Sequence, residues 1–105
     1  MRSLPQNDIF HSWCGVVSTH LVERGVRCSK DMVKELVLMK LGNTTELLGE
    51  KIAMRSSKYK QTDGELSVKE QQRGFVSMAG LLTSMEAWAA TDLDGLKLSR
   101  DEDEG

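Results

Sequence analysis

The sequence predicts an α+β fold that is mostly helical, with three main helices, a small β-hairpin and a disordered acidic C-terminal tail. Two patterns predict it: three stretches carry apolar residues at three- and four-residue spacing, and one stretch between them alternates with a period of two. The length of 105 residues is that of one domain, which we expect to span residues 1–98, with residues 99–105 as the tail.

The three predicted helices have recognisable ends. The first follows Pro5, with Ser3 or Asn7 as its N-cap, and ends before Gly25. The second follows Ser29 and covers about residues 30–41. Its spacing predicts these residues on the buried side: Met32, Val33, Leu36, Val37 and Leu41.

The last helix has the clearest pattern. Ser77 is its expected N-cap, and Gly95 lies just past its end. Its apolar residues fall on one side at helical spacing and are expected in the core: Met78, Leu81, Leu82, Met85, Trp88 and Ala89. Trp13 on the first helix is expected there as well, because it lies on that helix's apolar stripe.

The region between the second and last helices is expected to hold the β-hairpin. The period of two predicts a strand over residues 50–55, although residues 46–48 also fit an extension of the second helix. The pair Asp63-Gly64 is typical of a tight turn, which would let residues 50–60 pair with residues 65–68.

A short helical turn is predicted after this hairpin. Ser67 and Glu70 have the spacing of a capping box, in which each side chain bonds the backbone N–H of the other residue. The turn is expected to end at Gly74.

The composition excludes several classes of protein. No apolar run approaches the ~20 residues that span a bilayer, and the first residues lack the apolar stretch of a signal peptide, so a cytoplasmic protein is expected. Cys14 and Cys28 are then expected to be reduced thiols. The sequon Asn43-Thr44-Thr45 would have no use in such a protein.

Catalytic and metal-binding patterns are weak. The cysteines and histidines lack the spacing of a zinc site, and no glycine-rich phosphate loop occurs, so neither a metal nor a cofactor is expected. His11 precedes Cys14 by three residues, as in a nucleophile pair, but the apolar stripe around Cys14 favours a buried thiol. We expect no enzyme; a small nuclease is the alternative, with these formally available acids: Asp31, Glu35, Asp63 and Glu65.

Charge is unevenly distributed along the chain. The net charge is −2, but residues 91–105 hold six acids and two bases, so residues 1–90 carry a net charge of +2. Residues 51–60 hold four bases and no acid: Lys51, Arg55, Lys58 and Lys60. These bases could neutralise phosphates of a nucleic acid while Tyr59 stacks on an unpaired base. The alternatives are a strand edge protected by lysines and a Tyr59 that covers the core.

The N-terminal stretch Arg2-Ser3-Leu4-Pro5-Gln6-Asn7 resembles the motif that opens a helix in the NinB (Orf) family of phage recombination mediators. The similarity continues through residues 14–18 and returns in the last helix, residues 78–88, followed by Gly95-Leu96-Lys97. The strands that precede this motif in the family have no counterpart here, so a smaller sheet, or one completed by a partner, is expected. His11 stands where the family often has a tryptophan.

The resemblance implies an α+β homodimer that binds single-stranded DNA and assists recombinase loading with the single-strand-binding protein of a bacterial host. It implies DNA contacts by Gln6, Asn7 and Arg73, although residues 67–70 can be aligned to the same family element, with residues 71–76 as an insertion. Together with the basic segment, these residues form the expected DNA-binding set: Gln6, Asn7, Arg55, Lys58, Tyr59, Lys60 and Arg73. The alternative function is a module that binds or inhibits a host protein.

Overall fold

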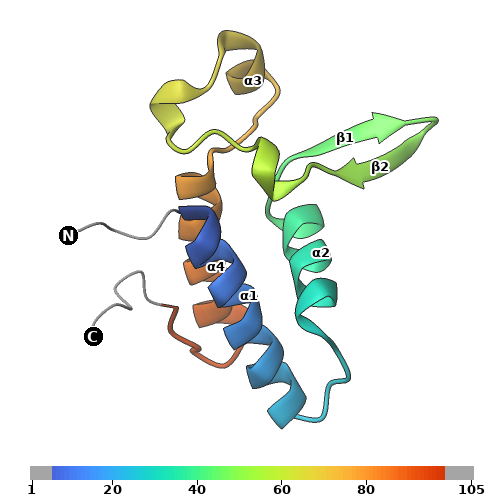
Figure 1. Ribbon diagram of the computed structural model, residues 1–105, viewed down its shortest axis with the longest axis vertical. Coiled ribbons are helices and arrows are strands. Elements are labelled where there is room, and N and C mark those ends of the chain that lie inside the picture. Colours follow the sequence, from blue (N-terminus) through green and yellow to red (C-terminus); the bar gives the residue numbers. More distant parts are fainter. Residues whose placement is uncertain (1–5, 99–105) are drawn as a thin grey trace.

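The computed structural model describes residues 6–98, and over these residues the mostly helical α+β fold is confirmed (Figure 1). Helix α1 (Gln6–Glu23) is followed by α2 (Lys30–Lys40), which runs antiparallel beside it, and α4 (Met78–Asp92) packs on α1 as well. Ser3, Pro5 and the predicted tail, residues 99–105, lie outside the described residues.

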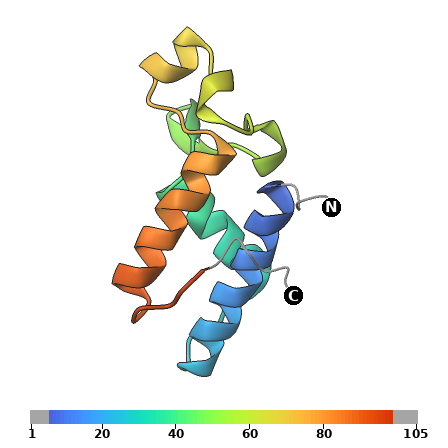
Figure 2. The same cartoon turned by 90° about the vertical axis from the view of Figure 1, so that its left-hand side faces the viewer.

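The segment between the hairpin and α4 lies over the end of the helices at which α1 begins (Figure 2). It contains two single-turn 3-10 helices, Ser56–Lys58 and Asp63–Glu65, and the short helix α3 (Val68–Gln72). We call residues 56–75 the cap segment. Its Lys60 and Gln61 carbonyl groups accept hydrogen bonds from the first backbone N–H groups of α4, at Met78 and Ala79, with N···O distances of 2.7 and 3.1 Å. The cap segment therefore satisfies donors that a helix N-terminus leaves unpaired.

The core lies between the three long helices. Trp13 and Val17 of α1 pack with Val33 and Val37 of α2 and with the buried side of α4. Five of the six core residues predicted on α4 are buried, while Trp88 is half-buried and packs against the core. Three predicted N-caps are confirmed: Ser29, Ser67 and Ser77 each accept a hydrogen bond from a backbone N–H of the first turn. Asn7 is not an N-cap, because α1 already includes Gln6 and Asn7.

The hairpin differs from the one predicted. Strand β1 (Thr44–Leu47) pairs antiparallel with β2 (Glu50–Ala53), so the predicted pairing of residues 50–60 with residues 65–68 is wrong, as is the helical reading of residues 46–48. The reversal is made by Leu48 and Gly49, whose φ angles of 53° and 79° are typical of a two-residue hairpin turn. Because leucine rarely adopts a positive φ, Gly49 is the one residue of this pair that signals a turn in the sequence. The pair Asp63-Gly64 lies in a 3-10 helix instead.

The buried side predicted for helix α2 is confirmed only in part. Val33, Val37 and Leu38 are buried and Leu41 packs against the core, but Met32 and Leu36 are 58% and 47% exposed. Together with Met39 they form an apolar strip on the face of α2 opposite the core. Helical periodicity alone could not choose between the two apolar sides, because the choice depends on where α1 lies.

Asn43, which joins α2 to β1, forms four hydrogen bonds that hold three parts of the chain together. Its backbone N–H donates to the Tyr59 hydroxyl (2.6 Å), and its backbone carbonyl accepts from the Met54 N–H (2.9 Å). Its side chain donates to the Val76 carbonyl (2.9 Å) and accepts from the Val76 N–H (2.8 Å). Only 4% of Asn43 is exposed, so its place in the sequon reflects no glycosylation site in the folded chain.

Candidate functional site

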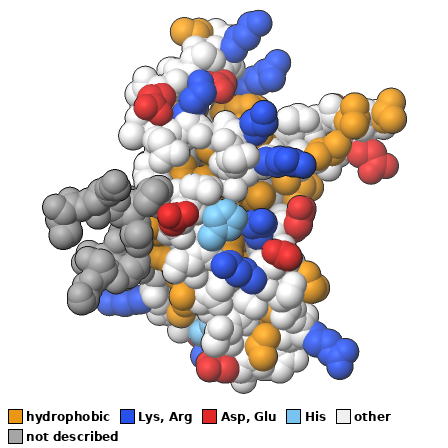
Figure 3. Space-filling model, in the orientation of Figure 1, with side chains coloured by type: hydrophobic (Ala, Val, Ile, Leu, Met, Phe, Trp, Pro, Cys, Tyr) orange, Lys and Arg blue, Asp and Glu red, His pale blue; other side chains and the backbone are white. Residues whose placement is uncertain are grey.

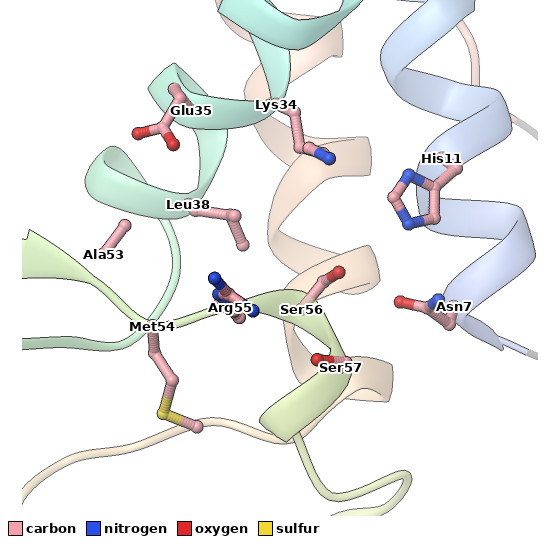
Figure 4. Close-up of a pocket in the computed structure, with 10 residues that line it drawn as sticks. All are labelled: Asn7, His11, Lys34, Glu35, Leu38, Ala53, Met54, Arg55, Ser56 and Ser57. Atoms are coloured by element: carbon pink, nitrogen blue, oxygen red, sulfur yellow. The ribbon is translucent and has the colours of Figure 1, made fainter.

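A groove of about 390 Å³ lies between α1, α2 and the segment that follows β2 (Figure 4). Polar and basic side chains from all three elements reach it, and apolar side chains form part of its wall. The lining residues are Asn7, His11, Lys34, Glu35, Leu38, Ala53, Met54, Arg55, Ser56 and Ser57.

Two pairs of these residues lie on the sides of α1 and α2 that face the groove. Asn7 and His11 lie four residues apart on α1, and Lys34 and Leu38 lie four residues apart on α2, so each pair shares one helix face. Arg55 belongs to the third wall, which is fixed by the hydrogen bond from the Met54 N–H to Asn43. In Figure 4 the side chains of Lys34 and His11 point toward one another across the groove, whereas the Glu35 carboxylate points away from His11.

The groove is electropositive where α1 faces α2. Burial and the nearby ammonium groups of Lys34 and Lys30 lower the pKa of His11 below its usual 6.5, although Asp8 acts in the opposite direction. The charges of Lys34 and Lys30 thus disfavour a proton on His11. An anion bound between His11 and these lysines would relieve the repulsion. The arrangement is suited to binding a phosphate.

Cys14 is excluded as a nucleophile by its environment. The thiol is fully buried, and burial raises its pKa to about 12 although Lys30 and Lys34 act in the opposite direction. A thiol with so high a pKa is almost entirely protonated at neutral pH. The expected buried thiol is therefore confirmed, and a Cys14–His11 catalytic pair has no support.

The groove brings together only two of the predicted DNA-binding residues, Asn7 and Arg55. Lys58 is exposed in the adjoining 3-10 turn. Lys60 lies 3.5 Å from the Glu70 carboxylate, so its charge is partly neutralised. Arg73 is exposed at the end of α3, in the outer part of the cap segment.

Gln6 has a structural contact that the sequence did not reveal. Its side-chain Nε2 donates to the Gln61 carbonyl at 2.8 Å, which ties the start of α1 to the cap segment. The same carbonyl accepts from Ala79, so this one oxygen links α1 and α4. A DNA contact by Gln6 stays a prediction, but the side chain already stabilises the fold.

Tyr59 was wrongly predicted to stack on a nucleic-acid base. It is 5% exposed, belongs to the core cluster and accepts the hydrogen bond from Asn43 through its hydroxyl. The alternative, in which Tyr59 covers the core, is confirmed. Burial raises the pKa of Tyr59, while the Asn43 hydrogen bond acts in the opposite direction.

Sequence reasoning missed Lys34 as part of the site, and it considered His11 as a catalytic partner of Cys14 and as a departure from a motif but not as a DNA-binding residue. Neither lies in the basic segment 51–60, and Lys34 has an acidic neighbour, Glu35, in the sequence. Only the packing of α2 against α1 places Lys34 beside His11. The signal that existed was the position of His11 four residues after Asn7, on the same helix face.

Basic side chains continue from the groove over the neighbouring surface. Lys and Arg side chains gather along the middle of the face shown in Figure 3, from the cap segment to the groove, with acidic side chains on both sides of them. Over residues 6–98, no helix is long and apolar enough to cross a membrane. Within the same residues, no group of three or more His, Cys, Asp or Glu side chains is placed to hold a metal ion.

Comparisons with known proteins find no relative of this chain. No family model, curated protein or solved structure matches it. The resemblance of residues 2–7, 14–18, 78–88 and 95–97 to the NinB family therefore stays a prediction.

Proposed function

We propose that the chain binds single-stranded DNA through the groove and the basic side chains around it, without a catalytic step. The observation that supports this most directly is the convergence of Lys34, Arg55 and His11 on one open groove. Arginine and lysine at this spacing can neutralise phosphates, and the hydroxyl groups of Ser56 and Ser57 can donate hydrogen bonds to them. Lys58 extends the positive surface beyond the groove.

Because charge supplies the affinity, binding is expected to be salt-dependent and to show little sequence preference. Each phosphate neutralised on a single strand contributes about 0.7 to the slope of log affinity against log salt concentration. A groove of about 390 Å³ has room for a single nucleotide rather than for a duplex, so single strands are the expected ligand. A role in recombination, with recombinase loading beside a host single-strand-binding protein in a bacterial cytoplasm, rests on the resemblance of residues 2–7, 14–18, 78–88 and 95–97 to the NinB family alone.

The test is fluorescence anisotropy with a labelled single strand of about 30 nucleotides and its duplex at several salt concentrations. Lys34→Ala/Arg55→Ala is expected to weaken binding of the single strand at least tenfold, which corresponds to about 1.4 kcal/mol, and to lower the salt slope by about 0.7 for each phosphate that the two side chains neutralise. Lys40→Ala is the matched control, since Lys40 is an exposed lysine on the same helix that does not line the groove. Equal affinities of the double variant and the control would contradict the proposal.

The apolar strip on α2 favours a second function, association of the chain with a second copy of itself. The hairpin leaves the end of α2, and Leu47, Leu48 and Ile52 on it are 59%, 94% and 42% exposed. A two-stranded hairpin is marginally stable alone, and within the described residues no further strand pairs with either of its edges.

Charge complementarity favours a second copy as the partner. Exposed acids and bases both occur on α2 and the hairpin, which carry this apolar surface: Glu35, Lys40, Glu46, Glu50 and Lys51. A surface that carries both positive and negative side chains can pair opposite charges with a second copy across a two-fold axis. A surface with charges of one sign would repel a second copy.

Sedimentation velocity over a range of protein concentrations tests this association. Leu48→Asn is expected to shift the chain to monomers without loss of stability, because asparagine tolerates the positive φ of this turn better than leucine. Val68→Thr is the control, since Val68 is an exposed valine on α3 outside the strip and hairpin. A monomer at all concentrations before any substitution would rule out self-association, and binding of a different protein would then be the remaining use of this surface.

A further inference from the structure

The groove combines a charged surface with an apolar one, and a phosphate alone would need only the charged surface. Lys34 and Arg55 supply positive charge, while Leu38 and Met54 supply apolar wall. Its volume of about 390 Å³ lies in the range of small-molecule sites, roughly 300–1,000 Å³. A nucleotide has the same combination, an anionic phosphate joined to a flat and largely apolar base.

Asn7 provides an independent observation. Its side-chain Oδ1 is buried and has no hydrogen-bond partner among the described residues. Buried polar atoms in native proteins almost always have a partner, so an acceptor left without one indicates a missing donor. Asn7 lines the groove, and Figure 4 shows its side chain directed toward it, so a rotation of this side chain brings the buried oxygen to the groove surface.

Nucleobases can supply that donor. Adenine, cytosine and guanine have amino groups on the edge that pairs in a duplex, and thymine has a ring N–H there. This edge is free only when the base is unpaired. An orphaned acceptor in the groove is therefore better matched by a base of a single strand than by a duplex or by phosphate, which offers acceptors only.

We propose that the groove binds one unstacked nucleotide of the strand, with its base against Leu38 and Met54, its base-pairing edge on Asn7, and its phosphate between Lys34 and Arg55. This inference rests on the proposed function, which it deepens by naming the ligand of the groove. The flexible Met54 side chain can adapt to bases of different shape, so the site accepts a base without selecting strongly among them.

The inference is tested by comparing two oligonucleotides of about ten units with the same number of phosphates, an oligothymidylate and its abasic counterpart. The abasic strand is expected to bind roughly tenfold more weakly, since base contacts are lost while charge is retained. Asn7→Ala is expected to weaken binding of the oligothymidylate about threefold or more and to leave binding of the abasic strand unchanged.

A matched control and a stability measurement keep this test independent of folding. Gln72→Ala removes an exposed amide on α3 outside the groove and should leave both affinities unchanged. Because Asn7 Oδ1 has no partner to lose, Asn7→Ala should unfold at the same urea concentration as the original chain, or at a higher one.

The outcomes separate this inference from the proposed function. Equal binding of the two strands, or an Asn7→Ala variant that binds oligothymidylate as well as the Gln72→Ala control, would overturn the nucleotide site and leave backbone binding intact. No binding of either strand at low salt would overturn both proposals.

Discussion

Replacing Asn43 by alanine should destabilise the fold far more than its position between two elements would suggest. The substitution leaves the backbone bonds of Asn43 to Tyr59 and Met54 in place but removes both side-chain bonds to Val76. Each lost hydrogen bond costs about 1 kcal/mol, and each backbone group of the half-buried Val76 left without a partner adds to this. We expect the free energy of unfolding to fall by about 3 kcal/mol.

That loss is a large part of the stability of a domain of this size, which is typically about 5–15 kcal/mol. At about 4–8 °C for each kcal/mol, it corresponds to a decrease in Tm of roughly 12–24 °C. Urea unfolding followed by tryptophan fluorescence measures it directly, because Trp13 lies in the core and its environment changes on unfolding.

Asn7→Ala is the matched control, since it removes the same amide group from a side chain whose buried oxygen has no partner. Its free energy of unfolding should stay within about 0.5 kcal/mol of the original. A loss below about 1 kcal/mol for Asn43→Ala, with an unchanged m value, would refute the view that Asn43 holds α2, the hairpin and the start of α4 together.

Four further outcomes follow from the groove and the core. Because the pKa of His11 lies below 6.5 and a bound phosphate favours the imidazolium, affinity for single-stranded DNA should rise as pH falls below about 6.5, and anisotropy should show a flatter profile for His11→Gln. Without DNA, the same lowered pKa means that the unfolded chain binds more protons, so the urea midpoint should decrease as pH falls through 6.5 toward the pKa of the folded state. Cys14, with a pKa of about 12, should resist alkylation at pH 8 until urea unfolds the chain, and rapid modification of the folded protein, located by mass spectrometry, would contradict its burial. Gly42→Ala should cost about 1–3 kcal/mol in urea unfolding, because a Cβ there would collide with the Tyr59 hydroxyl and lie 2.9 Å from the Leu38 carbonyl oxygen; an unchanged midpoint would show that this junction can relax.

The sequence alone determined the features that depend on neighbours along the chain. A serine that bonds the N–H group three residues ahead needs no distant partner, so the caps at Ser29, Ser67 and Ser77 were predictable. The same holds for the three long helices, because helical periodicity and capping act within a few residues. The buried side of α4 was predictable too, since this helix has one strongly apolar side.

Tertiary structure decided what depends on contacts between distant residues. Helix α2 has two apolar sides, and only the position of α1 determines that Val33 and Val37 are buried while Met32 and Leu36 are exposed. The hairpin register depends on a turn through Leu48, for which intrinsic preference is poor.

The candidate site belongs to this second group. Asn7, Lys34 and Arg55 come from three elements, and no spacing along the chain relates them. Tyr59 has the polar hydroxyl and aromatic ring of a binding residue, yet its ring is buried because Asn43, sixteen residues earlier, supplies the hydrogen bond that its hydroxyl needs inside the core. Helix formation is local and could be deduced from the sequence, whereas the groove exists only because packing brings three distant segments together.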